Sequence, residues 1–208
     1  MHLSGSQGNT HMSTIIAQEF QINHSKASSP SEEQIAWFAL SAPYRNEKRA
    51  KSYLESKGIE TFLPMRYEIV KNRYSGKTKE LVPAVSNLLF ARTTKSMLQQ
   101  VKAGVKYLQY KVKPEGNKNT PIIVPEDQME QFMTVCKNNN EQLLYFTSDE
   151  IDLKEGARVR VIGGEFDGLE GYFVKIKGKR NKRIVVHLPD LVSVALTEIE
   201  DGLIEVVK

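Results

Sequence analysis

The sequence predicts two folded units, an α+β unit over residues 34–137 with a sheet flanked by helices, and a small all-β unit over residues 151–208. Three observations support this fold class. Apolar runs of strand length alternate with helical patterns in the first unit, and the polar run 138–141 then breaks all periodicity. Apolar residues recur at every second position in the second unit, which is typical of half-buried strands.

The segments outside these units are polar. Residues 1–33 are rich in Ser, Gln, Asn and His, so we expect a disordered leader there. Residues 138–150 are expected to form an interdomain linker.

The elements of the first unit follow from apolar spacing and from punctuation by proline and glycine. Asn46 is a candidate N-cap, and Pro125 suits the first position of a helix. In order, we expect a strand over 35–40, a helix over 46–57, a strand over 60–64, a hairpin or loop over 71–80, a strand over 85–91, a short helix over 95–102, extended segments over 105–112 and 122–124, and a helix from Pro125 to Lys137.

Charge is distributed unevenly along the chain. Residues 41–113 hold 16 Lys and Arg against 5 Asp and Glu, whereas residues 114–150 hold 2 against 7 and residues 151–208 hold 10 against 10. A concentrated positive field attracts polyanions such as nucleic acid. The alternative is a solvated face with no partner.

Several classes of protein are disfavoured by what the sequence lacks. The single cysteine, Cys136, excludes an internal disulfide and fits a reducing cytoplasm, and no run approaches the ~20 apolar residues that span a bilayer. We expect no metal, no cofactor, no membrane contact and no secretory signal. Hydrolase and metalloprotease motifs are absent and His187 sits in an apolar strand, so catalysis is not expected.

The most informative segment is 157–176, ARVRVIGGEFDGLEGYFVKI. Its first strand places Val159, Val161 and Ile162 toward a small core, and the Gly163-Gly164 pair permits a chain reversal. The segment resembles a KOW motif, which marks SH3-like barrels in transcription elongation factors and ribosomal proteins. Any two-strand meander with a glycine-rich turn is the plainer alternative.

Residues of the first unit extend this resemblance to the NusG family, over about 35–207. Trp37-Phe38 resembles the family's opening aromatic pair, Glu47-Lys48 the start of its first helix, and Phe62-Leu63-Pro64 the strand that ends in proline. The resemblance implies an α+β NGN-type domain, with a mixed or antiparallel sheet flanked by helices, and a C-terminal all-β SH3-like KOW barrel.

One segment departs from the housekeeping pattern of that family. Residues 83–90, PAVSNLLF, lack its Pro-Gly-Tyr and instead resemble the specialised UpxY/RfaH-type antiterminators. That likeness implies an operon-specific antitermination factor for surface or capsular polysaccharide genes. A general NusG-type elongation factor and a KOW-containing ribosome- or RNA-binding protein are the alternatives.

The family resemblance also implies partners. The N-terminal domain would dock an apolar groove on the clamp helices of the largest RNA polymerase subunit, without catalysing a reaction. Each implied docking residue is equally suitable for a core, so that alternative stays open. The docking residues implied are Trp37, Phe38, Val85, Leu88 and Phe90.

The cationic part of the first unit would then lie beside the non-template DNA strand. Arg45 and Arg49 are one helical turn apart and could share a face, and tyrosines could stack on bases. For any single lysine, contact with polymerase or solvent alone is the alternative. The candidate nucleic-acid contacts are Tyr44, Arg45, Lys48, Arg49, Lys71, Arg73 and Tyr74.

The C-terminal barrel of the family recruits a partner such as ribosomal protein S10 or Rho. Phe166 matches the apolar loop residue of that contact, and Lys179 and Arg180 belong to a basic hairpin tip. Phe166 could equally close one end of the barrel. We expect a monomer.

Overall fold

The computed structural model describes residues 33–72, 76–137, 143–146, 153, 156–164, 166–176, 181–196 and 204–207. Every strand pairing recorded in these ranges is antiparallel. The leader expected over 1–33 lies outside the described residues except for Glu33.

A five-stranded sheet forms the centre of the N-terminal part. Its path is β2-β5-β1-β6, and β9 also pairs with β1. The sequence places apolar β-formers on these strands, and β1 reads AWFALS. The strands are β1 (Ala36–Ser41), β2 (Glu60–Phe62), β5 (Leu89–Thr93), β6 (Gln109–Tyr110) and β9 (Ile123–Val124).

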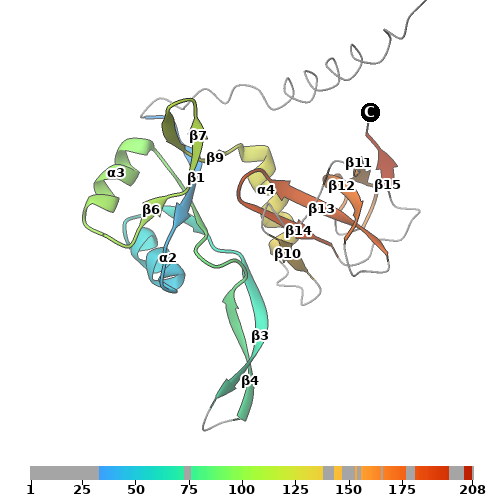
Figure 1. Ribbon diagram of the computed structural model, residues 1–208, viewed down its shortest axis with the longest axis horizontal. Coiled ribbons are helices and arrows are strands. Elements are labelled where there is room, and N and C mark those ends of the chain that lie inside the picture. The colour runs from blue at the N-terminus through green and yellow to red at the C-terminus, as the bar shows by residue number, and fades with distance from the viewer. Residues whose placement is uncertain are drawn as a thin grey trace, which may run out of the picture. The chain divides into compact units, whose positions relative to one another are not determined.

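Each face of this sheet has its own core, because neighbouring side chains on a strand point to opposite faces. Phe38 and Leu40 pack with α2 (Glu47–Ser56) and α3 (Lys95–Ala103). Trp37 and Ala39 pack with α4 (Glu126–Cys136). Figure 1 shows α2 and α3 on one side of β1 and α4 on the other. The expected α+β arrangement with flanking helices is confirmed here.

The helix starts differ from the expectation in two places. Asn46 occupies the N-cap position of α2 without capping it, since its Nδ2 donates to the carbonyl of Pro43 at 2.7 Å. The cap that sequence reasoning missed is Thr94, whose side chain accepts the N–H of Met97 at 3.2 Å and begins α3. Pro125 precedes α4 as its N-cap residue instead of occupying the first helical position.

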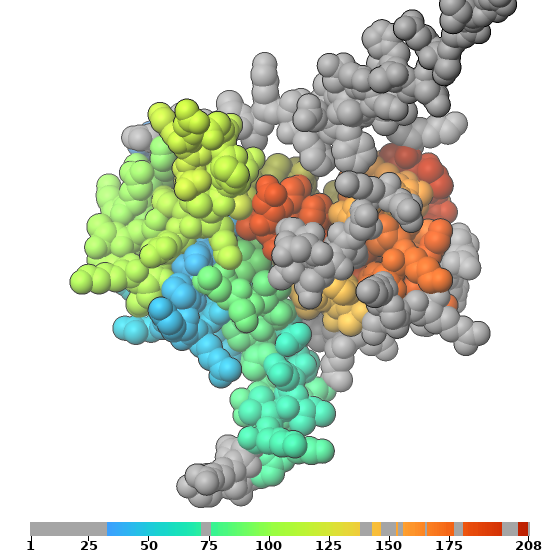
Figure 2. Space-filling view, viewed as in Figure 1, coloured from blue at the N-terminus to red at the C-terminus, as the bar shows by residue number. Residues whose placement is uncertain are grey.

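Two hairpins leave the sheet. β3 (Met65–Asn72) pairs along its whole length with β4 (Gly76–Pro83), which makes the hairpin longer than the expected 71–80. Figures 1 and 2 show this ribbon extending away from the five-stranded sheet. A shorter hairpin joins β7 (Val112–Glu115) to β8 (Lys118–Pro121).

A six-stranded sheet forms the C-terminal part, in the order β10-β14-β13-β12-β11-β15. No pairing between the two outer strands closes it into a barrel within the described residues. Val159 and Val161 are buried as expected, but Ile162 is 47% exposed because it follows the last residue of its strand. The strands are β10 (Leu144–Phe146), β11 (Ala157–Val161), β12 (Glu170–Lys175), β13 (Lys182–Leu188), β14 (Val192–Ala195) and β15 (Ile204–Val206).

Strand β10 lies inside the expected linker, 138–150. Its three residues pair with β14, so this segment adds an edge strand to the C-terminal sheet. The remaining linker residues, apart from Leu143, lie outside the described part of the chain.

Candidate partner-binding and nucleic-acid interface

An aromatic cluster occupies the α4 face of the N-terminal sheet. The rings of Phe90 and Phe132 meet edge to face with centroids 5.9 Å apart, and Phe62 meets Phe132 in the same way at 6.1 Å. Trp37 and Leu88 belong to the same buried cluster, and each is 1% exposed.

Trp37 is also fixed through its one polar atom. Its Nε1 donates to Oε1 of Glu126 at 3.4 Å, and Glu126 in turn accepts from Nε of Arg92 at 3.0 and 3.2 Å. The indole therefore has a hydrogen-bond partner within the N-terminal part and packs beneath the first turn of α4.

Four of the five expected docking residues cannot touch a partner in this conformation. Trp37, Leu88 and Phe90 face α4, and Phe38 is buried among α2 and α3. For these four the alternative of a core residue fits the structure. Val85 alone is half-buried and reaches the surface.

The rim of the aromatic cluster includes two residues that the sequence reasoning did not place at the docking surface. Phe62 on β2 and Met133 on α4 are both half-buried and pack against the cluster, as Val85 does. The sequence predicted only that Phe62 lies in a strand and Met133 in a helix, because the spacing of apolar residues does not show where a covering helix ends.

The same cluster continues into the C-terminal sheet, where α4 contacts β13. Ile184, Val186 and Leu188 of that strand are buried members of it. Cys136, at the end of α4, is a buried packing residue of this cluster. Burial raises the pKa of its thiol to about 12, so the thiol stays protonated at neutral pH, whereas the thiolate is the nucleophilic form.

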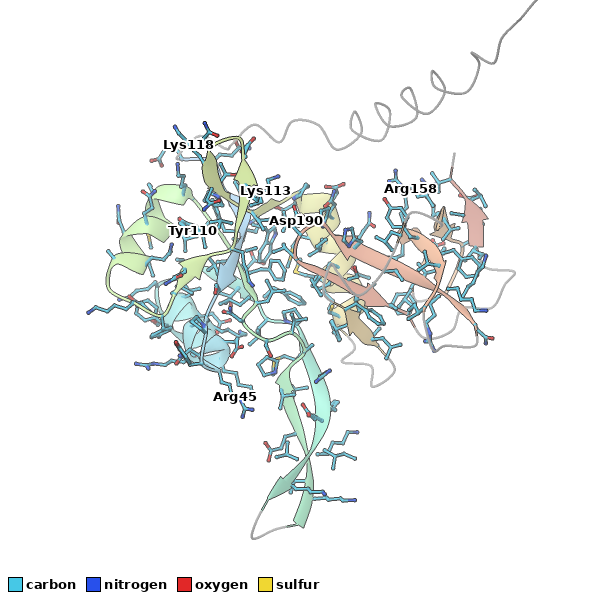
Figure 3. All side chains as sticks on the ribbon, in the orientation of Figure 1. Arg45, Tyr110, Lys113, Lys118, Arg158 and Asp190 are labelled. Atoms are coloured by element: carbon cyan, nitrogen blue, oxygen red, sulfur yellow. The ribbon has the colours of Figure 1, made fainter. Side chains whose placement is uncertain are left out.

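The turn before α2 projects two of the expected nucleic-acid contacts. Tyr44 and Arg45 have φ angles of 61° and 60°, the left-handed region that non-glycine residues rarely adopt. Tyr44 is 92% exposed, and Arg45 lies just before the first residue of α2 (Figure 3). The sequence suggested that Arg45 and Arg49 could share a helix face. Arg45 instead precedes α2, so the two residues do not share one.

The two expected nucleic-acid contacts on α2, Lys48 and Arg49, have protein partners. The guanidinium of Arg49 lies over the ring of Tyr107, with Cζ 4.8 Å from the centroid. Nζ of Lys48 donates to the carbonyl of Leu81 on the β3–β4 hairpin at 2.6 Å. The side chains of Lys48 and Arg49 remain exposed despite these contacts.

The β3–β4 hairpin carries Lys71, which is exposed as expected. Arg73 and Tyr74 lie outside the described residues. The sequence reasoning missed Tyr67, an exposed tyrosine whose ring lies 4.6 Å from Nζ of Lys79. The sequence did contain a signal for this strand, because apolar or aromatic and charged residues alternate over 65–69.

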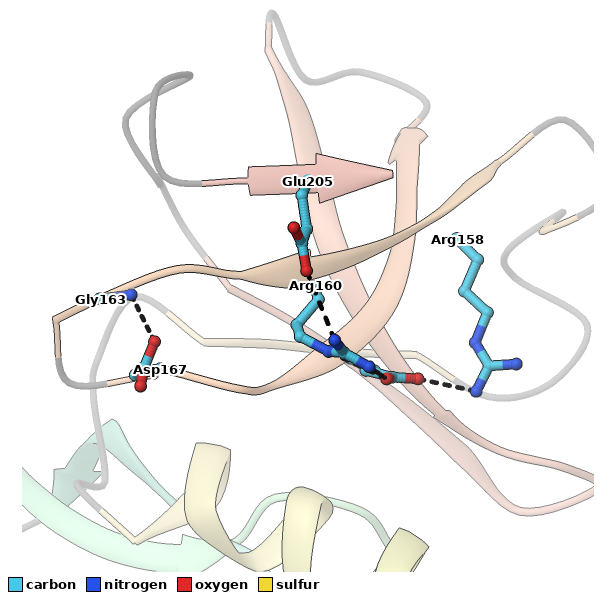
Figure 4. Close-up of polar contacts among 6 residues, drawn as sticks. Arg158, Arg160, Gly163, Asp167 and Glu205 are labelled. Atoms are coloured by element: carbon cyan, nitrogen blue, oxygen red, sulfur yellow. Dashed lines mark hydrogen bonds and ion pairs between the residues drawn. The ribbon is translucent and has the colours of Figure 1, made fainter. Parts of the chain in front are cut away.

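The turn after β11 contains the expected partner residue Phe166. Asp167 Oδ1 accepts the N–H of Gly163 at 2.5 Å and closes the turn (Figure 4). Phe166 is half-buried against the large cluster and lines, with residues of α4, a cavity of about 290 Å³. Lys179 and Arg180 lie outside the described residues.

An ion-pair network links the three neighbouring strands β11, β12 and β15. Glu170 accepts from Arg160 at 2.6 Å and from Arg158 at 2.8 Å, and Arg160 also reaches Glu205 on β15 at 3.4 Å (Figure 4). The hydrogen bond from Arg160 is the largest cause that lowers the pKa of Glu170.

The described residues contain no group of three His, Cys, Asp or Glu side chains that could hold a metal ion. In the same part of the chain, no helix has the length and apolar character needed to cross a bilayer.

Comparison with known proteins finds a matching family model and a similar solved structure. No curated protein matches the chain. A solved structure titled "Domain interaction in Thermotoga maritima NusG" is similar at 16% identity and a TM-score of 0.41, covering 86% of this chain and 100% of that chain. A family model described as "Transcription termination factor nusG" matches residues 35–133, which contain the N-terminal sheet and most of α4.

Proposed function

We propose that this chain is a NusG-type transcription elongation factor that binds RNA polymerase and modulates pausing and termination without catalysing a reaction. The observation that carries the proposal is the NusG family match over residues 35–133, which runs from β1 through most of α4. A second, all-β part follows it, as the resemblance of residues 157–176 to a KOW motif requires.

The proposed docking surface for the polymerase clamp helices is the rim formed by Phe62, Val85 and Met133. These side chains combine partial exposure with a rigid aromatic backing, which lowers the entropy cost of binding. Trp37, Leu88 and Phe90 would then act from beneath, by fixing the rim in place.

The proposed second contact is with the non-template DNA strand. Tyr44, Arg45 and the lysines of the β3–β4 hairpin are exposed on one basic part of the chain, and aromatic and cationic side chains together suit single-stranded nucleic acid. The expected loss of affinity with rising salt would accompany this contact.

Two finer proposals concern specialisation and the C-terminal part. The sequence PAVSNLLF at 83–90 supports an operon-specific factor of the UpxY/RfaH type, which would raise readthrough on its own leader and not on others. The C-terminal sheet would form an SH3-like KOW barrel that recruits ribosomal protein S10 or Rho through Phe166.

The decisive experiment measures binding of the full chain to core polymerase, with and without the clamp helices. Phe62→Asp and Val85→Asp should each lower the affinity at least about tenfold, since a charge would enter the apolar contact. Val112→Asp, on the exposed β7, is the matched control and should bind normally. Equal binding by all three variants, or tighter binding to ribosomal RNA than to polymerase, would overturn the proposal.

A further inference from the structure

The side chains of Lys102 and Tyr110 meet between the last turn of α3 and strand β6. Nζ of Lys102 lies 3.4 Å from the centroid of the Tyr110 ring. The same ring contacts Phe38 of β1, with the two centroids 5.9 Å apart. The tyrosine is therefore packed against the sheet and held beside α3, with the lysine amine over its face (Figure 3).

The hydroxyl group of Tyr110 lacks an acceptor. Its oxygen is buried and makes no hydrogen bond to any described residue. Burial also raises the pKa of Tyr110, so the group keeps its hydrogen and remains a donor. The charged amine of Lys102 has only donors and cannot accept that hydrogen. The pair therefore leaves one buried donor unpaired, which costs free energy until an acceptor is supplied.

The amine of Lys102 is partly shielded from water. The residue is half-buried, and burial lowers the pKa of its amine, whereas the aromatic face beneath it favours the charged form. A lower pKa leaves more of the neutral amine, which is the form that attacks acyl groups. Lys106, four residues later in the chain, is exposed and serves as the comparison within the same molecule.

The charge of this part of the chain selects the class of reagent. Residues 41–113 hold 16 Lys and Arg against 5 Asp and Glu, so their field attracts anions. An acyl phosphate combines negative charge with an activated carbonyl group, and its carbonyl oxygen is an acceptor of the kind that the Tyr110 hydroxyl lacks.

We propose that Lys102 is a site of acylation by acyl phosphates, with the Tyr110 hydroxyl as the donor to the acyl oxygen. The amine nitrogen bonds to the carbonyl carbon, the bond from that carbon to the phosphate oxygen breaks, and phosphate leaves with the electron pair while the amine loses one proton to water. The carbonyl oxygen gains negative charge during the attack, and a fixed donor stabilises that charge. In the product, the amide oxygen accepts the same hydrogen. This modification does not depend on polymerase binding.

The test follows the reaction of the full chain with acetyl phosphate, and mass spectrometry measures the rate at each lysine. At about pH 8, Lys102 should react at least about threefold faster than Lys106. Tyr110→Phe keeps the ring beneath the amine and removes an unpaired hydroxyl, so the fold should be kept. This variant should slow Lys102 at least about threefold and leave Lys106 unchanged. Tyr107→Phe, at the ring that Arg49 contacts, is the matched control and should leave both rates unchanged.

A chain that carries acetyllysine at position 102 tests the product directly. The change in the urea midpoint on acetylation should be more favourable in the chain with Tyr110 than in Tyr110→Phe, because only the hydroxyl can donate to the acetyl oxygen. Three results would overturn the inference: a rate at Lys102 no higher than at Lys106, an unchanged Lys102 rate in Tyr110→Phe, or the same midpoint change with and without the hydroxyl.

Discussion

The buried carboxylate of Glu47 accepts the backbone N–H of Asn87 at 2.7 Å, although the two residues are 40 positions apart. This bond ties the first turn of α2 to the loop before β5. Ser41 adds a second tie, because its Oγ lies 2.7 Å from Oδ1 of Asn87. Ser41 and Glu47 flank the turn at Tyr44 and Arg45, so both sides of that turn are bonded to the left-handed Asn87.

Replacement of Glu47 by alanine should therefore destabilise the fold. The N–H of Asn87 would lose its partner in a part-buried place, which costs about 1–3 kcal/mol. Urea unfolding followed by circular dichroism measures the change. Glu115→Ala, at an exposed position on β7, is the control, and an equal effect in both variants would show that the Glu47 bond contributes nothing.

The alternation along β1 and β5 was enough to predict which residues share a face. Leu88 and Phe90 do belong to one cluster and Leu89 to the other. The identity of the covering element was not predictable in the same way, since α4 begins almost 90 residues after Trp37 in the chain. A face that could serve a partner is therefore covered by the chain itself.

The candidate site was harder to predict than the fold. The left-handed Tyr44 and Arg45 have no glycine to announce them, and spacing alone placed Arg45 on the helix with Arg49. Strand β10 did carry a signal, the apolar triplet Leu144–Phe146, but polar neighbours on both sides favoured a linker. In both cases contacts distant in sequence decided the local structure.

Gly171 on β12 should not tolerate a side chain. A Cβ there would lie 2.7 Å from Cγ2 of Ile184 and 2.8 Å from the carbonyl oxygen of Val185, and the second contact is with backbone that cannot turn aside. Gly171→Ala should cost about 1–3 kcal/mol of unfolding free energy.

Gly104 provides the matched control for that substitution. Its Cβ would meet only ordinary contacts, at 3.6 Å or more, and its φ angle is negative. Gly104→Ala should change stability by less than about 1 kcal/mol. A Gly171→Ala variant as stable as Gly104→Ala would mean that β12 and β13 can separate without cost.

The ion pairs of Glu170 should make stability depend on pH in the acid range. Its pKa is lowered in the folded state, chiefly by the hydrogen bond from Arg160, so the folded protein prefers the carboxylate. The stabilisation is present above the unfolded pKa of about 4.3 and is lost as pH falls through the lower folded value.

Glu170→Gln should therefore flatten the decline of the urea midpoint between about pH 5 and pH 3. Glu205→Gln removes only the longer 3.4 Å contact with Arg160 and should leave most of that decline in place. The effect should shrink in high salt, because the two arginines that pair with Glu170 are about half exposed. An unchanged pH profile in Glu170→Gln would show that the network is not linked to folding.

Cys136 reports whether α4 stays closed over the aromatic cluster. Only the thiolate reacts with disulfide reagents, and burial raises the pKa of this thiol to about 12, so at pH 8 the folded protein holds it as the unreactive thiol. A thiol reagent should label the folded chain very slowly and the urea-unfolded chain at once. Lys137→Cys in a Cys136→Ser background moves the thiol to an exposed neighbour and should react freely. Fast labelling of native Cys136 would mean that α4 lifts often, which would make Trp37, Leu88 and Phe90 available to a partner after all.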